Sequence, residues 1–299
     1  MRKLIVGTDW WTDCDDAVAM RLLARAAKEG QIELLGVGID ACMEDSVASL
    51  DAFFRLEGID DLPIGLDAAA VDFTGTPSYQ KRLAAHPAAK RRNIDAEDAA
   101  AMYRRLLAQA NEPVEIIEIG FPQVLAAVLM SGADQYSERS GVELFREKVA
   151  KVWVMAGKWD EVGGREHNFC LTQRASCAAE AFCRLCPVPV TFLGWEVGAD
   201  VITGSHLSRQ DHLYQVLCDH GSPNGRMSWD PMLVLMALVG DEQKAGYRVM
   251  RGKATVRAEN GANFFEEAPD GLHGYVVKER ENEFYSEWID RLIQSVRQT

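Results

Sequence analysis

Residues 3–16 read KLIVGTDWWTDCDD, and they decide the fold because they join a buried strand to a cluster of acids. The apolar run LIV at residues 4–6 is typical of a strand that is covered on both faces. Four carboxylates follow within eight residues, at Asp9, Asp13, Asp15 and Asp16. Acids make up 45 of 299 residues, so an average window of eight holds roughly one. Because like charges repel at the exit of a buried strand, the cluster predicts a bound cation.

The strand at residues 3–7 opens a pattern in which short apolar runs alternate with helical periodicity. The runs expected to be strands are residues 3–7, 32–39, 62–66, 113–120, 150–157 and 188–195. Helical spacing follows most of them, as in residues 15–30 and 46–58. Helical crossovers join parallel strands, so we predict an α/β fold with an open, mainly parallel, Rossmann-like sheet and helices on both faces. We expect residues 1–299 to form a single domain.

The last quarter of the chain has a different pattern. Residues 247–267 and 271–279 alternate with a strand period around the turn signal Asn260-Gly261, which predicts a C-terminal antiparallel appendage. Residues 283–297 have the spacing of an amphipathic helix. The side chains that we expect it to bury are Phe284, Trp288, Leu292 and Val296. The polar, Ala-rich residues 67–100 are expected to be an insertion over the sheet edge.

The composition argues against partners with phosphate backbones. The formal net charge is −13, and the densest basic run is Lys90-Arg91-Arg92, so neither nucleic acid nor an anionic membrane surface is an expected partner. No apolar stretch is long enough for a membrane span. The seven cysteines are scattered, which favours reduced thiols and a cytoplasmic location.

Polar residues follow the ends of several predicted strands. In an open parallel sheet ligands bind at the carboxyl ends of the strands, so we expect these residues to meet in one crevice. They are Asp9 to Asp16, Gln123, Glu166 and Asn168, with Asp230 at the start of a later helix. Carboxylates without His or Cys favour Ca²⁺ or Mg²⁺. The alternative is that Asp13, Asp15 and Asp16 only cap the helix after them.

Four segments, in order, resemble the inosine-uridine-preferring nucleoside hydrolase family. Residues 9–16 resemble its Asp-rich first loop, in a longer form. Residues 117–129, IEIGFPQVLAAVL, resemble a second segment, and residues 152–157 with Glu166-x-Asn168 resemble the sugar-binding stretch. Ser228-Trp229-Asp230 resembles the last metal-ligand segment. The resemblance covers nearly the full length and implies the nucleoside hydrolase fold.

The resemblance also implies roles for these residues. Asp9 would be a calcium ligand and the base for the attacking water, with Asp16, Asp230 and the backbone carbonyl of Gln123 as further ligands. Asp13 or Asp15, with Glu166 and Asn168, would hold the ribose hydroxyls, while Met155 would pack against the sugar and Trp229 could stack on the base. The implied cofactor is Ca²⁺, the substrate is a nucleoside or related ribosyl compound, and the implied assembly is a homodimer or homotetramer.

The chain also departs from the family pattern. Gly7 stands where the family has a structural Asp, Cys42-Met43 stand near the place of an Asn, and Trp229 stands where a leaving-group His is common. Indole cannot act as a general acid, so His220 and His273 are alternative candidates. A noncatalytic, calcium-containing ribosyl-binding protein of the same fold is therefore the alternative function. A phosphatase of the haloacid dehalogenase type is disfavoured because Trp10-Trp11 interrupts the required Asp-x-Asp pair.

Overall fold

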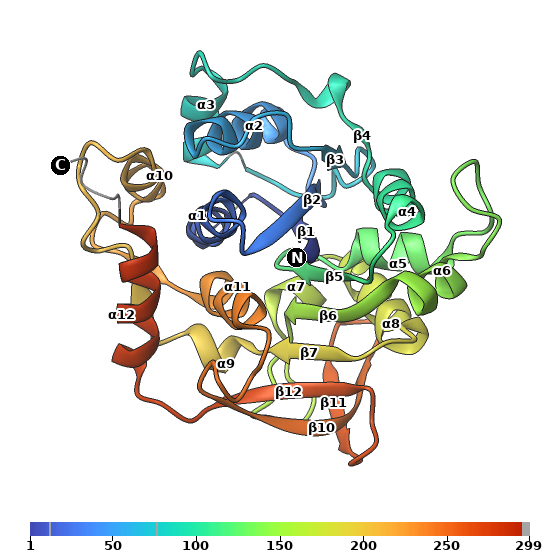
Figure 1. Cartoon of the computed structure of the whole chain (residues 1–299). Coiled ribbons are helices and arrows are strands. Elements are labelled where there is room, and N and C mark those ends of the chain that lie inside the picture. Colours follow the sequence, from blue (N-terminus) through green and yellow to red (C-terminus); the bar gives the residue numbers. More distant parts are fainter. Residues whose placement is uncertain (12, 76, 295–299) are drawn as a thin grey trace.

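A ten-stranded sheet runs through the protein in the computed structural model, which describes residues 1–11, 13–75 and 77–294 (Figure 1). The strands are β1 (Arg2–Thr8), β2 (Ile32–Ile39), β3 (Ile64–Leu66), β4 (Glu97–Asp98), β5 (Val114–Glu118), β6 (Val149–Met155), β7 (Val190–Leu193), β10 (Tyr247–Val256), β11 (Asn263–Glu267) and β12 (His273–Lys278). Their spatial order is β11-β10-β12-β7-β6-β5-β1-β2-β3-β4. The first strand of the chain thus lies inside the sheet.

The sheet is parallel except at one edge. Strand β1 pairs in parallel with β2 and β5, and the pairing continues outward to β4 and to β7. Strand β12 also pairs in parallel with β7, whereas β10 pairs in antiparallel with β12 and β11. The predicted mainly parallel sheet and the antiparallel C-terminal part are confirmed. The C-terminal part is continuous with the main sheet, because β12 joins the two.

Helices cover both faces of this sheet, as the alternating pattern predicts. One apolar core contains side chains of α1 (Asp15–Lys28), α2 (Ser46–Leu56), α10 (His212–His220), α11 (Trp229–Val239) and α12 (Asn282–Ile293). The other contains side chains of α4 (Ala99–Gln109), α5 (Gln123–Met130), α6 (Gly141–Lys148) and α8 (Gln173–Leu185). Strand β1 contributes Leu4 and Val6 to the first core and Ile5 to the second, since successive side chains of a strand point to opposite faces.

Short elements complete the chain. They are α3 (Ser78–Ala84), the 3₁₀ turn η1 (Asn93–Asp95), α7 (His167–Cys170), α9 (Trp195–Gly198) and a two-stranded sheet of β8 (Ile202–Thr203) and β9 (Arg226–Met227). The segment that contains α3 packs against the loop after β1, where the Gln80 side-chain amide donates to the Trp10 carbonyl over 2.5 Å. The indole of Trp11 donates to the carbonyl of Gly75 over 3.3 Å. The expected insertion therefore lies beside the acid-rich loop.

The buried face of α12 differs from the predicted one. The helix buries Tyr285, Ile289 and Ile293 instead, while Phe284 and Leu292 are 38% and 37% exposed. Trp288 is half-buried, and Val296 lies outside the described residues. Two apolar stripes run side by side on this helix, each with i, i+4 spacing. The hydrogen bond from the Tyr285 hydroxyl to the Gly246 carbonyl, 2.6 Å long, accompanies burial of the second stripe.

Among the described residues, no helix combines the length and the apolar character that a bilayer crossing requires.

Candidate functional site

One cavity of about 230 Å³ lies where the carboxyl ends of β1, β5 and β6 meet the start of α11. The residues that line it are Asp9, Asp13, Asp15, Asp16, Ile119, Met155, Glu166, His167, Asn168, Trp195, Arg226, Trp229 and Asp230. Nine of the ten residues predicted for the site are among them. The exception is Gln123, which is buried and donates its side-chain amide to the Asp40 carbonyl over 2.9 Å. The crevice expected at the strand ends is thus present.

The loop after β1 turns sharply to place its first carboxylate. Trp10 adopts φ = 45°, a conformation that costs energy for a residue with a side chain. Its ring is fully buried and its indole donates to the Ser49 hydroxyl over 2.9 Å, which holds the residue in place. The turn brings the Trp11 amide within 3.1 Å of the Asp9 carboxylate. Asp9 is therefore held at the floor of the cavity by its own loop.

Three carboxylates converge at the start of two helices. Asp15, Asp16 and Asp230 each place an oxygen within 4.8 Å of the others, and all three are buried. None of the acids in the loop caps α1 through a side-chain hydrogen bond. Asp16 instead accepts from the Thr8 hydroxyl, and Asp15 accepts from the Asp230 amide over 3.1 Å. Asp15 and Asp16 do lie in the first turn of α1, as the capping alternative expects, but that alternative explains neither Asp230 nor the convergence of the three carboxylates.

The donor set fits a hard divalent cation. All three groups offer oxygen ligands, which Ca²⁺ and Mg²⁺ prefer. Burial away from water, together with mutual repulsion, raises the pKa of Asp15, Asp16 and Asp230 well above the ordinary value. A bound cation would relieve both effects, because it replaces the protons that these carboxyl groups otherwise need.

Asp9 and Glu166 also have perturbed proton affinities. Burial raises the pKa of Asp9 to about 8, and the charges of Asp13 and Asp15 act in the same direction. Burial likewise raises the pKa of Glu166 to about 7. With a pKa of about 8, Asp9 is largely protonated at neutral pH in the absence of a cation, and a positive charge beside it would restore the carboxylate that can accept a proton.

Glu166 and Asn168 are fixed side by side near the end of β6. The Glu166 carboxylate accepts from the amides of Gly157 and Asn168, over 2.9 and 2.8 Å. The side-chain amide of Asn168 donates to the Met155 carbonyl over 2.9 Å. These bonds set a carboxylate, an amide and a thioether on one wall of the cavity, an arrangement able to hold a small polyhydroxylated molecule.

Asp13 forms an ion pair with Arg226, a residue that was not predicted to be part of the site. Arg226, on β9, donates from Nε and Nη2 to the two carboxylate oxygens of Asp13, over 2.8 and 2.5 Å. Burial alone would raise the pKa of Asp13, but its hydrogen bonds and the positive charge of Arg226 lower it. Of the two acids predicted to hold ribose hydroxyls, Asp15 is consequently the less committed to another side chain. No sequence pattern marks Arg226, because its role depends on a contact with Asp13, 213 residues away.

Two tryptophans form an aromatic wall of the cavity. Trp229 and Trp195 stack with ring centroids 6.4 Å apart, and the Trp229 indole donates to the Trp195 carbonyl over 2.7 Å. Trp195 is 43% exposed, so part of its ring is open to a ligand. It was not predicted because the expected strand, residues 188–195, included it; the strand ends at Leu193, which places Trp195 just past the strand end. Trp10, Trp11 and Trp159 are buried and do not line this cavity.

The two histidines proposed as leaving-group acids are not in the cavity lining. His273 lies buried on β12 and accepts a hydrogen bond from the Ala254 amide over 3.0 Å. The Nε2 atom of His220 is 3.9 Å from a carboxylate oxygen of Asp13, behind the lining residue. The histidine that lines the cavity is His167, whose ring lies 5.6 Å from that of Phe121.

A second pair of acids lies beneath the site. Asp40 follows β2 and Glu118 ends β5; both are fully buried. The Asp40 Oδ2 and Glu118 Oε2 atoms find no hydrogen-bond donor among the other described residues, and burial raises the pKa of both groups, so the two carboxyls can share a proton. A Cβ on Gly7 would overlap the Glu118 carboxylate, so Glu118 fills the space beside Gly7. A carboxylate is therefore present near the position where the family pattern has an Asp, but it comes from the neighbouring strand. Asp40, rather than Cys42-Met43, occupies the end of the second strand.

No protein-family model matches the sequence, and no curated protein matches it at a significant level. Solved structures are similar over nearly the whole chain. An inosine-uridine-preferring nucleoside hydrolase from Bacillus anthracis aligns with a TM-score of 0.71 and 15% identity, over 98% of this chain and 99% of that one. A plant nucleoside hydrolase gives 0.74 and 15%, over 99% of each chain.

Other solved structures extend the comparison. A purine-preferring ribonucleoside hydrolase from Gardnerella vaginalis gives a TM-score of 0.73 and 17% identity, over 98% of both chains. The type III effector protein XopQ, solved in complex with adenosine diphosphate ribose, gives 0.68 and 14%, over 98% of this chain and 93% of that one. The expectation for the fold is confirmed: this chain adopts the nucleoside hydrolase fold.

Proposed function

We propose that the protein is a Ca²⁺-dependent N-ribohydrolase that cleaves the N-glycosidic bond of a nucleoside or a related ribosyl compound. The observation that carries the proposal is the meeting of Asp9, Asp15, Asp16 and Asp230 with Glu166 and Asn168 in one cavity. The carboxylates offer ligands for the cation, and the opposite wall offers groups for sugar hydroxyls. The fold shared with several nucleoside hydrolases supports the same assignment.

Asp16 and Asp230 of the converging carboxylates would hold the cation together with Asp9, which lines the same cavity and which the family resemblance implies as a ligand. The backbone carbonyl of Gln123 is implied by the same resemblance, although this residue lies outside the cavity lining. Calcium supplies a positive charge that orients a water molecule and the ribose hydroxyls. Asp9 takes the proton of that water, in keeping with the burial that raises its pKa to about 8. Its carboxylate is fixed by the Trp11 amide, so the base is already oriented for the reaction.

The remaining lining residues would bind the substrate. Asp15, Glu166 and Asn168 hold the ribose hydroxyls, and Met155 packs against the sugar. The surrounding negative charge favours the oxocarbenium-like transition state of glycosidic cleavage. The stacked Trp195 and Trp229 offer a flat surface to the leaving base.

A nucleoside panel tests the proposal. The protein, supplied with Ca²⁺, is incubated with purine and pyrimidine ribonucleosides, and free ribose and base are assayed. We expect release from at least one nucleoside, and a loss of about 10³-fold or more in kcat for Asp9→Asn, since a general base is removed. No release by protein shown to bind Ca²⁺ would contradict a hydrolase.

The second candidate is a noncatalytic ribosyl-binding protein that keeps the calcium site. Trp229 favours it, because it replaces the expected leaving-group His by a side chain that cannot donate a proton as an acid. The same fold occurs in an effector solved with adenosine diphosphate ribose. Calorimetry with ribose and adenosine diphosphate ribose, beside the activity panel, separates the two candidates: binding without turnover favours the second.

A further inference from the structure

Arg226 brings a permanent positive charge into a cavity otherwise lined by acids. Among the described lining residues the other ionisable groups are six carboxyls and His167. The guanidinium reaches the cavity from β9, a strand of the small sheet outside the main fold. No cation ligand or sugar contact requires such a group, so its position calls for a separate explanation.

Asp13 fixes the orientation of this guanidinium. The two hydrogen bonds to Asp13 use Nε and Nη2, and they form a bidentate pair that holds the plane of the group. The Nη1 atom makes no hydrogen bond to any residue within the described ranges. One end of the guanidinium therefore keeps N–H donors for a ligand. Asp13, one of the two carboxylates predicted to contact ribose, holds the arginine.

The guanidinium also lies beside the aromatic wall. Its central carbon is 5.7 Å from the ring centroid of Trp229, and both residues line the same cavity. A planar base stacked on Trp195 or Trp229 would thus have its edge within reach of an arginine donor. The sugar-binding wall, formed by Glu166 and Asn168, belongs to a different part of the chain near β6. Arg226 is consequently placed for the leaving group rather than for ribose.

We propose that Arg226 is a further catalytic residue, which donates a hydrogen bond to the departing base and stabilises its negative charge. The inference rests on the proposed ribohydrolase function. As the C1′–N bond breaks, its electron pair stays with the base and spreads onto an acceptor oxygen or ring nitrogen. The water oxygen forms the new bond to C1′, Asp9 receives the water proton, and solvent then protonates the released base anion.

This step selects substrates by the acidity of the leaving group. A guanidinium stays charged throughout the working pH range and stabilises an anion without transferring a proton. Rates without proton donation fall steeply as the leaving group becomes less acidic. The substrate class is therefore a riboside whose base departs as a stabilised anion and presents an acceptor at its edge. His167 is the alternative candidate for leaving-group activation among the lining residues, because a histidine would act by transferring a proton to the base.

The test compares Arg226→Met and Arg226→Gln with wild type on inosine and on p-nitrophenyl riboside, whose leaving group is already a stable anion. We expect Arg226→Met to lower kcat on inosine by about 10²–10³-fold, the usual cost of losing one charge-stabilising donor. Its kcat on the nitrophenyl riboside should change by less than about 5-fold. The kcat of Arg226→Gln on inosine should lie between the values for wild type and Arg226→Met, because glutamine keeps an N–H donor.

Two controls separate this inference from its alternatives. His167→Phe should leave the alkaline side of the pH–rate profile unchanged; a selective loss of that side would assign proton donation to His167 and overturn the role of Arg226. Equal losses on both substrates for Arg226→Met and Arg226→Gln, with circular dichroism showing that both fold, would also overturn it. If the wild type cleaves neither these two ribosides nor any member of the nucleoside panel, the proposed function itself fails.

Discussion

Glu118 and Gly7 lie on neighbouring strands and compete for one space. The carboxylate of Glu118 occupies the volume that a side chain at residue 7 would need. Its Oε1 atom accepts from the Gly120 amide over 3.1 Å, which anchors the loop that follows β5. The Glu118 carboxylate thus compensates for the missing side chain at residue 7, because it fills the space beside Gly7.

The compensation predicts a coupling between the two positions. Gly7→Asp should destabilise the wild-type protein by about 2 kcal/mol or more, because two carboxylates would be forced into one buried space. In a Glu118→Ala background the same substitution should cost much less, since the space is free. Urea unfolding of the four proteins measures this coupling as a double-mutant cycle. The same cost in both backgrounds would contradict the compensation.

The individual site residues that the sequence predicted are those that follow strands in order. Asp9 and Glu166 were identifiable because each follows a predicted strand, and the nearby residues alone indicate both the strand and the acid after it. Arg226 was not identifiable in this way, since its role depends on its contact with Asp13, far away in the sequence. Asp40 and Glu118 were not predicted, because a single acid at a strand end is indistinguishable from a solvent-exposed one until the packing around it is known.

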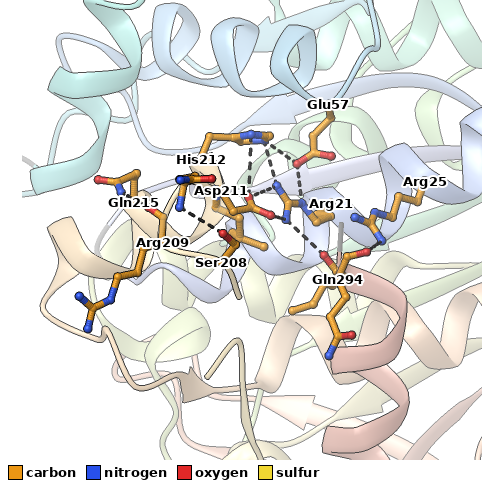
Figure 2. A network of polar contacts seen from close by, with 12 residues as sticks. Arg21, Arg25, Glu57, Ser208, Arg209, Asp211, His212, Gln215 and Gln294 are labelled. Atoms are coloured by element: carbon orange, nitrogen blue, oxygen red, sulfur yellow. Dashed lines mark hydrogen bonds and ion pairs between the residues drawn. The ribbon is translucent and has the colours of Figure 1, made fainter. Parts of the chain in front are cut away.

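Helix α1 connects the acid cluster to a buried charge network. Its first turn carries Asp15 and Asp16, and Arg21 lies farther along the same helix. Arg21 donates to Glu57 over 2.6 Å and to both oxygens of Asp211 over 2.6 and 2.8 Å (Figure 2). It also donates to the Ile293 carbonyl at the end of α12. The network joins α1, α2, α10 and α12. Its central side chain, Arg21, is only 2% exposed.

Loss of Arg21 should be costly for stability. Arg21→Ala removes the hydrogen bonds that Arg21 donates to two buried carboxylates and leaves Glu57 with His212, so we expect a loss of about 3–5 kcal/mol in the free energy of unfolding. Arg25→Ala is the matched control, because Arg25 lies one turn later and donates to the Leu292 and Gln294 carbonyls near the surface. Its cost should stay below about 1 kcal/mol. Chemical denaturation of both variants checks the difference; similar costs would contradict the importance of burial.

Helix α12 shows why a helix can be predicted while its buried face is not. The periodicity correctly placed a helix near residues 283–293, but Phe284 and Tyr285 begin two adjacent apolar stripes of equal spacing. Spacing alone cannot choose between them. The buried stripe is the one that packs against side chains elsewhere in the chain. Here that partner is Tyr247, whose ring lies 5.0 Å from that of Tyr285.

The architecture of the whole molecule followed from the alternation of strands and helices. Six apolar runs in the sequence became parallel strands, and the site formed at their carboxyl ends as that topology requires. The insertion of β12 between β7 and β10 was not predictable, because a strand period does not specify a partner or a direction. The small β8–β9 sheet was missed because its strands have two residues each.

Cation binding should stabilise the entire fold, and more strongly at high pH. In the cation-free protein burial raises the pKa of Asp9 to about 8 and that of Glu166 to about 7, from ordinary values of 3.8 and 4.5. A raised folded-state pKa gives stability that is complete below the unfolded value and is lost as pH rises through the folded one. The cation-free protein should therefore lose stability between pH 6 and pH 8.

Ca²⁺ competes with protons for the oxygens of Asp9, Asp16 and Asp230, whose pKa burial raises, so it binds more tightly at pH 8. At a 100-fold excess over Kd the stabilisation is about 2.7 kcal/mol. We expect the difference in thermal midpoint between calcium and chelator to be larger at pH 8 than at pH 6, and to shrink in Asp230→Asn. Scanning calorimetry at the two pH values measures it, and equal differences at both would contradict the assignment of these carboxylates to the cation.

The ion pair between Asp13 and Arg226 has a consequence for biosynthesis. The acid-rich loop leaves the ribosome first, whereas Arg226 and Asp230 follow more than 200 residues later. An N-terminal fragment that ends before residue 226 can form the inner strands but carries neither the arginine nor the last carboxylate. Both residues must be translated before the cavity is complete, so a product truncated before residue 226 cannot form the whole cavity. Two separately expressed halves, divided before β8, should need each other to regain the cavity.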